Sequence, residues 1–126
     1  MKINTFDCDG VIYLGKDIIG VYPGPNDIII TGRSFEEREE TNKMLYERGI
    51  TNMVFFNPLP FDQKTRETSG QHKARIISQI LADGNEIGCH FEDDPTQAME
   101  IKKVHLHLPI VMMIHHLITM ENVRHI

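Results

Sequence analysis

The chain contains no tryptophan, only two cysteines, and no apolar run as long as a membrane span. A transmembrane helix needs about 20 predominantly apolar residues, so a membrane-spanning protein is not expected. Two cysteines, Cys8 and Cys89, cannot supply the disulfide framework of a small secreted domain, and both are expected to be free thiols. Acidic residues near the start also disfavour a secretory signal. We therefore expect a cytoplasmic protein.

Basic residues are in the minority, with 13 Lys and Arg against 18 Asp and Glu and a net charge of -5. Nonspecific binding to nucleic acid or to an anionic membrane relies on basic surface, so composition predicts neither partner. Hydrophobic residues make up 40% and charged residues 25%, which is typical of a globular protein. The length predicts a single domain over residues 1–126.

Short apolar runs recur along the chain and predict strands over residues 3–8, 27–31, 52–56, 87–91 and 108–114. Runs such as IIIT, MVFF and IVMMI are apolar at successive positions, which is typical of parallel strands covered on both faces. Helices are predicted over residues 34–48, 71–82 and 95–103. This alternation predicts an α/β fold, a three-layer, doubly wound, Rossmann-like parallel sheet of about five strands.

Local signals refine these elements. Ser34 and Glu37 predict a capping box at the start of the first helix, and Arg48 lies at its end. Residues 10–24 (GVIYLGKDIIGVYPG) predict a β-hairpin inserted directly after the first strand. Residues 57–70 predict a polar loop.

Polar residues follow the predicted strands at the edge where an open α/β sheet binds its ligands. They are Asp7 and Asp9 after the first strand, Thr31, Gly32 and Arg33 after the second, and Glu92, Asp93 and Asp94 after the fourth. Clustered carboxylates repel one another unless a hard divalent cation with oxygen ligands neutralises them. The pattern therefore predicts a Mg²⁺ site.

The same residues suit the chemistry of a phosphate monoester, which is doubly anionic. A carboxylate can attack phosphorus only when a metal, a lysine and backbone donors screen that charge. Thr31 and the amide of Gly32 can hold phosphate oxygens, and Lys73 can supply a positive charge. Asp7 can then attack in line.

Four segments resemble, in order, the four motifs of the haloacid dehalogenase-like (HAD) hydrolases. They are FDCDGVI from Phe6, IIITGR from Ile28, HKA from His72 and FEDDP from Phe91. The resemblance spans most of the chain and implies a HAD-like fold in which the hairpin forms a flap beside the nucleophile and no cap domain follows. It also implies a magnesium-dependent phosphatase that works through a phosphoryl-aspartate.

The resemblance implies a role for each matching residue. Asp7 is the nucleophile, Asp9 is a general acid and base, and Lys73 stabilises the nucleophile and the phosphoryl group. The metal is held by Asp7, by the backbone carbonyl of Asp9 and by the acidic pair Asp93 and Asp94. The resemblance favours Asp94 as the direct ligand and Asp93 as its support, but a shift of one residue would exchange these roles. The phosphate-binding candidates are Gly10, Thr31, Gly32, Arg33 and Lys73.

Within the family, the segments TGRSFEEREET, HKARIISQIL and EDDPTQAMEI resemble the phosphatase domain of polynucleotide kinase/phosphatases. A nucleic-acid 3′-phosphate is thus one candidate substrate. A nucleotide or another small phosphoester is an equal candidate, because glutamates between Glu36 and Glu40 stand where a basic track is expected. A site without a cap domain could also be closed by a partner subunit. The sequence therefore leaves open whether the protein forms a homo-oligomer.

Some assignments have alternatives. Lys64 could hold the role of Lys73, and Arg33 could pair with the glutamates of its own helix. Cys8 is expected to pack in the core, because its side chain points away from its two aspartate neighbours in a regular strand. His105 and His107 are expected in a strand, and together with histidines 115 and 116 they lack zinc-site spacing, so a histidine metal site is not expected.

Two other classes of protein compete with the phosphatase. A receiver domain of a signalling protein would end its third strand on a phosphoacceptor, where this chain has Asn57, and would have a helix after Asp9. A catalytically silent binding or regulatory protein with the HAD fold is disfavoured by the complete set of acids.

Overall fold

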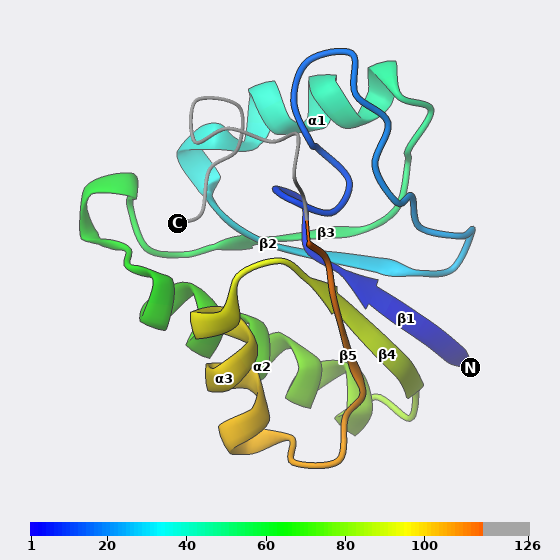
Figure 1. The fold of residues 1–126 in the computed structure, drawn as a ribbon, viewed down its shortest axis with the longest axis vertical. Helices are drawn as coiled ribbons and strands as arrows, with labels where there is room; N and C mark the ends of the chain where they lie inside the picture. Colours follow the sequence, from blue (N-terminus) through cyan, green and yellow to red (C-terminus); the bar gives the residue numbers. More distant parts are fainter. Residues whose placement is uncertain (115–126) are drawn as a thin grey trace.

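The computed structural model describes residues 1–114 and shows two strands followed by helices that alternate with further strands (Figure 1). The strands are β1 (Lys2–Phe6), β2 (Ile28–Ser34), β3 (Val54–Asn57), β4 (Glu86–Glu92) and β5 (Ile110–Met112). The helices are α1 (Arg38–Glu47), α2 (Arg66–Ala82) and α3 (Pro95–Val104), with short 3₁₀ helices η1 (Phe35–Glu37) and η2 (Phe61–Gln63). In this part of the chain the strand order is β3-β2-β1-β4-β5 and every pair is parallel. The predicted α/β, Rossmann-like parallel sheet is confirmed.

Helices cover both faces of the sheet, with α1 on one side and α2 and α3 on the other (Figure 1). Successive side chains of a strand point to opposite faces. Ile29 of β2 therefore packs in the core that contains Leu45 of α1, whereas Ile30 packs in the core that contains Ile77 of α2. Because both faces are covered, the strand is apolar at successive positions.

Helix α2 begins at Arg66, five residues before the predicted start, so the predicted loop 57–70 is partly helical. Thr65 caps the helix by accepting a hydrogen bond from the backbone N–H of Thr68, at 3.1 Å. The first turn carries no apolar stripe, and this is why periodicity missed it. Gly70 lies where α2 crosses α3, and a Cβ at this position would come within 2.7 Å of the Cβ of Glu100. Glycine here permits close helix packing.

The first predicted helix, over 34–48, begins as the 3₁₀ turn η1 and continues as α1. The backbone N–H of Ser34 donates to Oε2 of Glu37 at 2.7 Å, which is the glutamate half of the predicted capping box. Gly49 follows the helix with a φ of +75°, a left-handed conformation that favours glycine.

The predicted β-hairpin over residues 10–24 is not formed. Only isolated bridges occur in this segment, between Asp9 and Tyr13 and between Tyr13 and Ile19. Arg48 holds the segment instead: its Nη1 donates to the carbonyl of Ile18 at 2.7 Å and its Nη2 to that of Gly15 at 3.1 Å. These side-chain bonds, with one backbone bond from the N–H of Val21 to the carbonyl of Val11 at 2.8 Å, hold the segment without a regular ladder.

The last predicted strand, over 108–114, shortens to β5. His105 caps the end of α3 through its backbone N–H, which donates to the carbonyl of Ile101 at 2.9 Å, and His107 lies in the following turn. These two histidines are therefore not strand residues as predicted, and histidines 115 and 116 lie outside the described residues. Among residues 1–114, no helix has both the length and the apolar content needed to cross a bilayer.

Candidate active site

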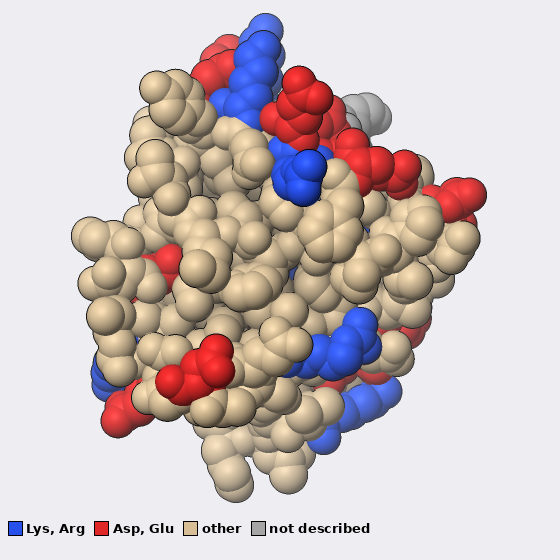
Figure 2. Space-filling view, turned by 180° about the vertical axis from the view of Figure 1, so that it is seen from behind, with Lys and Arg blue, Asp and Glu red and all other residues tan. Residues whose placement is uncertain are grey.

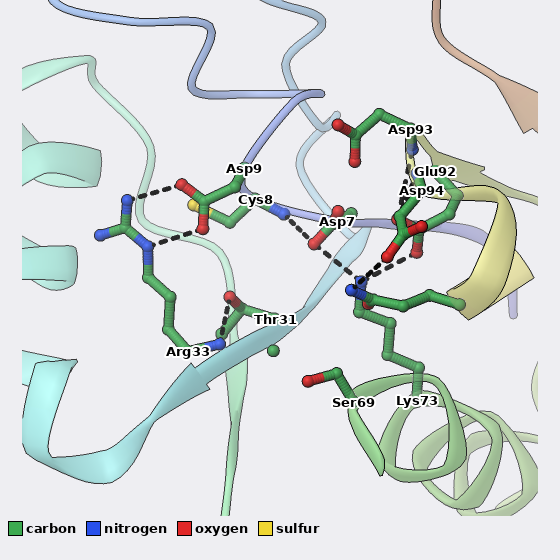
Figure 3. Close-up of polar contacts among 12 residues, drawn as sticks. Asp7, Cys8, Asp9, Thr31, Arg33, Ser69, Lys73, Glu92, Asp93 and Asp94 are labelled. Atoms are coloured by element: carbon green, nitrogen blue, oxygen red, sulfur yellow. Dashed lines mark hydrogen bonds and ion pairs between the residues drawn. The ribbon is translucent and has the colours of Figure 1, made fainter. Parts of the chain in front are cut away.

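The candidate site lies where the carboxyl ends of β1 and β4 face α2. Parallel pairing aligns Phe6 with Phe91, so Asp7, just past β1, and Glu92, the last residue of β4, lie side by side. The backbone N–H of Asp7 continues this pairing by donating to the carbonyl of Phe91 at 3.0 Å. Lys73 of α2 reaches between the two carboxylates (Figure 3).

Lys73 links the two carboxylates. Its Nζ lies 2.9 Å from Oδ1 of Asp7 and 2.8 Å from Oε1 of Glu92, and all three side chains are buried. Burial lowers the pKa of Lys73, but the charges of Asp7 and Glu92 outweigh it and hold that pKa above its ordinary value. Oδ1 of Asp7 also accepts the backbone N–H of Cys8 at 2.8 Å. The carboxylate of Asp7 is therefore held in one orientation.

Asp93 brings a third carboxylate to this group. One oxygen each from Asp7, Glu92 and Asp93 lies within 4.8 Å of the others, which makes these residues a candidate metal-binding set. Gly10 makes room for Asp93: a Cβ on Gly10 would lie 1.9 Å from Oδ2 of Asp93. Hard oxygen donors at this spacing fit a Mg²⁺ ion.

The electrostatics of the three acids differ. Burial, followed by the charge of Glu92, raises the pKa of Asp7 well above its ordinary value, although Lys73 acts to lower it. Burial and the charge of Glu92 likewise raise the pKa of Asp93 to about 7. Burial also acts to raise the pKa of Glu92, but Lys73 and His90 outweigh it and hold that pKa below its ordinary value. The cluster holds more negative charge than Lys73 neutralises, so a divalent cation suits it.

Within the cluster, several protein donors hold the carboxylate of Glu92. Oε1 of Glu92 accepts from Lys73 and lies 3.1 Å from Nε2 of His90, while Oε2 accepts the backbone N–H groups of Asp93 and Asp94 at 3.2 and 3.3 Å. Both oxygens of Glu92 are thus engaged by protein donors. This engagement disfavours Glu92 as a direct metal ligand and suits it to hold Lys73 in place.

Asp94 caps α3. Its Oδ1 accepts the backbone N–H of Thr96 and its Oδ2 accepts Nε2 of Gln97, both at 3.0 Å. The resemblance favoured Asp94 over Asp93 as the direct metal ligand, but the geometry favours Asp93, because the carboxylate of Asp94 is used by the helix start.

Asp9 faces away from Asp7 (Figure 3). Its carboxylate accepts a bidentate pair of bonds from Arg33, from Nε at 2.9 Å and from Nη2 at 2.7 Å. Both residues are only 5% exposed. Arg33 therefore pairs with Asp9 rather than with the glutamates of its own helix.

The other phosphate-binding candidates surround these acids. Thr31 is fully buried, and its Oγ1 accepts the backbone N–H of Arg33 at 3.0 Å. The backbone N–H of Gly10 donates to the carbonyl of Tyr13 at 2.9 Å, so it supports the loop that follows β1. Lys64, the alternative to Lys73, lies elsewhere: its Nζ donates to the carbonyl of Gly32 at 2.9 Å and to Glu37 at 2.7 Å.

Sequence reasoning assigned no role to two buried residues beneath the site, Thr5 and His90. Nδ1 of His90 lies 2.8 Å from Oγ1 of Thr5, and Nε2 of the same ring contacts Glu92. A strand alternates its faces, so a polar residue two positions before a site acid on the same strand is the signal that could have found them.

No family model, curated protein or solved structure matches this chain with significant similarity. The geometry of the site therefore carries the functional argument.

Proposed function

We propose that this protein is a HAD-like phosphatase that hydrolyses phosphate monoesters with Mg²⁺ and a phosphoryl-aspartate on Asp7. The observation that carries the proposal is the position of Asp7. Its carboxylate is oriented by Lys73 and by the amide of Cys8, and it lies within 4.8 Å of two further acids. Mg²⁺ held by Asp7, Asp93 and the backbone carbonyl of Asp9 would supply positive charge against the phosphate oxygens.

The reaction needs two displacements at phosphorus. First a carboxylate oxygen of Asp7 attacks phosphorus, and the bond to the ester oxygen breaks as that oxygen takes a proton from Asp9. A water molecule then attacks the phosphoryl-aspartate and gives its proton to Asp9, which releases inorganic phosphate and restores the carboxylate of Asp7. Lys73 holds Asp7 in place, while Thr31 and the amide of Gly32 bind phosphate oxygens.

Asp9 can give a proton to the ester oxygen only after its bonds to Arg33 loosen, because both of its carboxylate oxygens accept hydrogen bonds from the guanidinium. A phosphate dianion competes for the same guanidinium, since bidentate binding suits phosphate as well as carboxylate. Substrate binding to Arg33 thus prepares Asp9 for proton transfer.

The net charge and the face drawn in Figure 2 favour a small substrate. On the face of the protein shown in Figure 2, lysine and arginine side chains lie singly or beside acidic ones and form no continuous band among the residues drawn as described. A long nucleic acid binds through many phosphate contacts with basic side chains. With a net charge of -5, a nucleotide or another small phosphoester is favoured over a polynucleotide end.

The test is hydrolysis of p-nitrophenyl phosphate with Mg²⁺ or with excess chelator. We expect turnover only with the metal and a fall of at least about 10³-fold in Asp7→Asn, which removes the nucleophile. Asp83→Asn is the matched control, because Asp83 lies at the far end of α2 and should leave turnover unchanged. Equal turnover in Asp7→Asn would refute the mechanism. Mg²⁺ binding without turnover on any phosphoester would indicate a silent binding protein.

The role of Asp9 has its own test. An aryl phosphate has a leaving group that needs no proton, whereas an alkyl phosphate needs one. In Asp9→Asn, hydrolysis of the alkyl ester should fall much more than hydrolysis of the aryl ester. Because both substrates are measured on one protein sample, any loss of folded protein cancels in the ratio. An equal fall on both esters would remove Asp9 from the acid role.

A further inference from the structure

Beneath the candidate site lies a pair of polar residues that the proposed reaction does not use. Thr5 and His90 face each other across the pairing of β1 with β4, and both are fully buried. Thr5 precedes Asp7 by two residues, as His90 precedes Glu92, so each pair shares one face of its strand. The two polar residues thus form a layer directly below the two acids.

Short contacts join this layer to the nucleophile. Oγ1 of Thr5 lies 2.8 Å from Nδ1 of His90, and Nε2 of His90 lies 3.1 Å from Oε1 of Glu92. The same oxygen of Glu92 accepts Nζ of Lys73 at 2.8 Å, and Nζ lies 2.9 Å from Asp7. The chain of contacts therefore runs without a gap from Thr5 to Asp7.

Donor and acceptor rules allow one arrangement for a neutral imidazole. An ionised Glu92 only accepts, so the bond to Nε2 requires the ring proton on that nitrogen. Nδ1 of His90 must then be the acceptor, and the hydroxyl of Thr5 must donate to it. The geometry accordingly assigns the Nε2-protonated tautomer to His90 and makes Thr5 the residue that selects it.

This arrangement orients the acid that holds Lys73. Without the bond from His90, Oε1 of Glu92 would lose a buried side-chain donor, and the two longer backbone bonds to Oε2, at 3.2 and 3.3 Å, would hold the carboxylate less firmly. The position of Nζ of Lys73 against Asp7 would then be less well fixed. Hydrogen-bond partners behind a site often set its activity in this way.

We infer that Thr5 and His90 are positioning residues for the phosphatase site: the Thr5 hydroxyl selects the His90 tautomer that holds Glu92, and Glu92 holds Lys73 against Asp7. This inference rests on the proposed function. It adds a layer behind the site that the reaction steps themselves do not require.

The test compares Thr5→Val with Thr5→Ser. Valine keeps the shape of threonine and removes the hydroxyl, whereas serine keeps the hydroxyl. We expect Thr5→Val to lower kcat by roughly 10-fold or more with KM changed less than about 2-fold, and Thr5→Ser to restore kcat to within about 3-fold of the natural protein. A loss of packing alone would affect the serine variant, which lacks a methyl group, at least as much. Equal kcat in Thr5→Val and the natural protein would overturn the inference.

A second measurement needs no turnover. Nitrogen-15 chemical shifts of the His90 ring report which nitrogen carries the proton, and we expect Nε2 in the natural protein and in Thr5→Ser. A proton on Nδ1 in the natural protein would overturn the inference even if Thr5→Val does not fold. Absence of turnover in the natural protein would reject the proposed function and, with it, the positioning role of Thr5 in that reaction. The ring nitrogens would still show whether Thr5 selects the tautomer.

Discussion

Asp7 and Asp9 are separated by one residue, yet their carboxylates have opposite electrostatic surroundings. Asp7 lies in a group of three carboxylates, with Glu92 and Asp93, that contains one ammonium, Lys73. Asp9 lies in a one-to-one pair with Arg33. Figure 3 shows the two groups on either side of the end of β1.

The comparison separates two uses of buried charge. The Asp9–Arg33 pair is balanced and bidentate, so it contributes to the fold as it stands. The Asp7 group has excess negative charge, and burial raises the pKa values of Asp7 and Asp93. Such a group destabilises the fold and gains from a cation. The Asp9–Arg33 pair is therefore satisfied without a ligand, whereas the group around Asp7 is suited to bind a cation.

The largest expected effect on stability comes from breaking the Asp9–Arg33 pair. Asp9→Asn leaves the buried guanidinium of Arg33 without its counter-charge, and we expect the free energy of unfolding to fall by about 3 kcal/mol. Urea denaturation measures this. Glu47→Gln is the control, because it breaks an exposed pair with Lys43 and should cost less than about 1 kcal/mol. A cost for Asp9→Asn no larger than that of the control would contradict the comparison.

The neighbouring acids Asp93 and Asp94 should respond in opposite directions. In metal-free protein at pH 8, Asp93→Asn relieves repulsion and should raise the free energy of unfolding by on the order of 1 kcal/mol. Asp94→Asn removes the negative charge at the start of α3 and the oxygen that accepts Nε2 of Gln97, and should lower it by up to about 1 kcal/mol. Added Mg²⁺ should raise the melting temperature of Asp94→Asn but not of Asp93→Asn. If both variants kept the response to Mg²⁺, Asp93 would not be a ligand.

The raised pKa of Asp93 should make the stability of the protein depend on pH. The pKa of Asp93 is about 7 in the folded protein against 3.8 for the free side chain, so between these values the folded state binds more protons than the unfolded state. The free energy of unfolding should therefore fall as pH rises from about 4 to 7. His72 has the opposite effect on stability, because burial lowers its pKa to about 4 and the unfolded state then binds more protons than the folded state above that pH.

The difference between the natural protein and Asp93→Asn, measured by urea denaturation across this range, isolates the contribution of Asp93. We expect the stabilising effect of the substitution to grow with pH. A difference that stays constant or shrinks as pH rises would contradict the raised pKa.

A comparably small effect is expected at Thr41, a buried residue that contacts Arg33 of the Asp9–Arg33 pair. Oγ1 of Thr41 accepts Nη1 of Arg33 at 3.1 Å and donates to the carbonyl of Glu37 at 2.7 Å. Thr41→Val should lower the free energy of unfolding by roughly 0.5 to 1.5 kcal/mol, and Thr41→Ser should largely retain it. Thermal unfolding followed by circular dichroism measures both. Equal losses in the two variants would assign the effect to packing.

The sheet was predictable from the sequence, whereas some of its connections were not. Uninterrupted apolar runs such as the one around Ile29 and Ile30 indicate strands buried on both faces, because no other short element hides every residue. The first turn of α2 has no apolar stripe and depends on the cap at Thr65. The segment after β1 was predicted as a hairpin and is held instead by Arg48, a distant residue of the chain.

The site was predictable as a set of residues but not as a set of partners. The sequence placed Asp7, Asp93 and Lys73 near one sheet edge, and the structure brings them together. It could not choose between Asp93 and Asp94, because a shift of one residue after β4 decides which carboxylate caps α3. Nor could it decide whether Lys73 or Lys64 contacts Asp7, because both lie near the start of the second long helix: Lys64 just before α2 and Lys73 within it.

The sequence by itself determined the parallel sheet and the acids that follow its strands, because apolar runs and strand ends are local properties of the chain. Only the tertiary structure decided that Asp7 faces Lys73 while Asp9 faces Arg33, and that Thr5 and His90 lie beneath Glu92. Those pairings depend on which strands become neighbours and on the register between them. Strand order and register are set by packing across the whole domain.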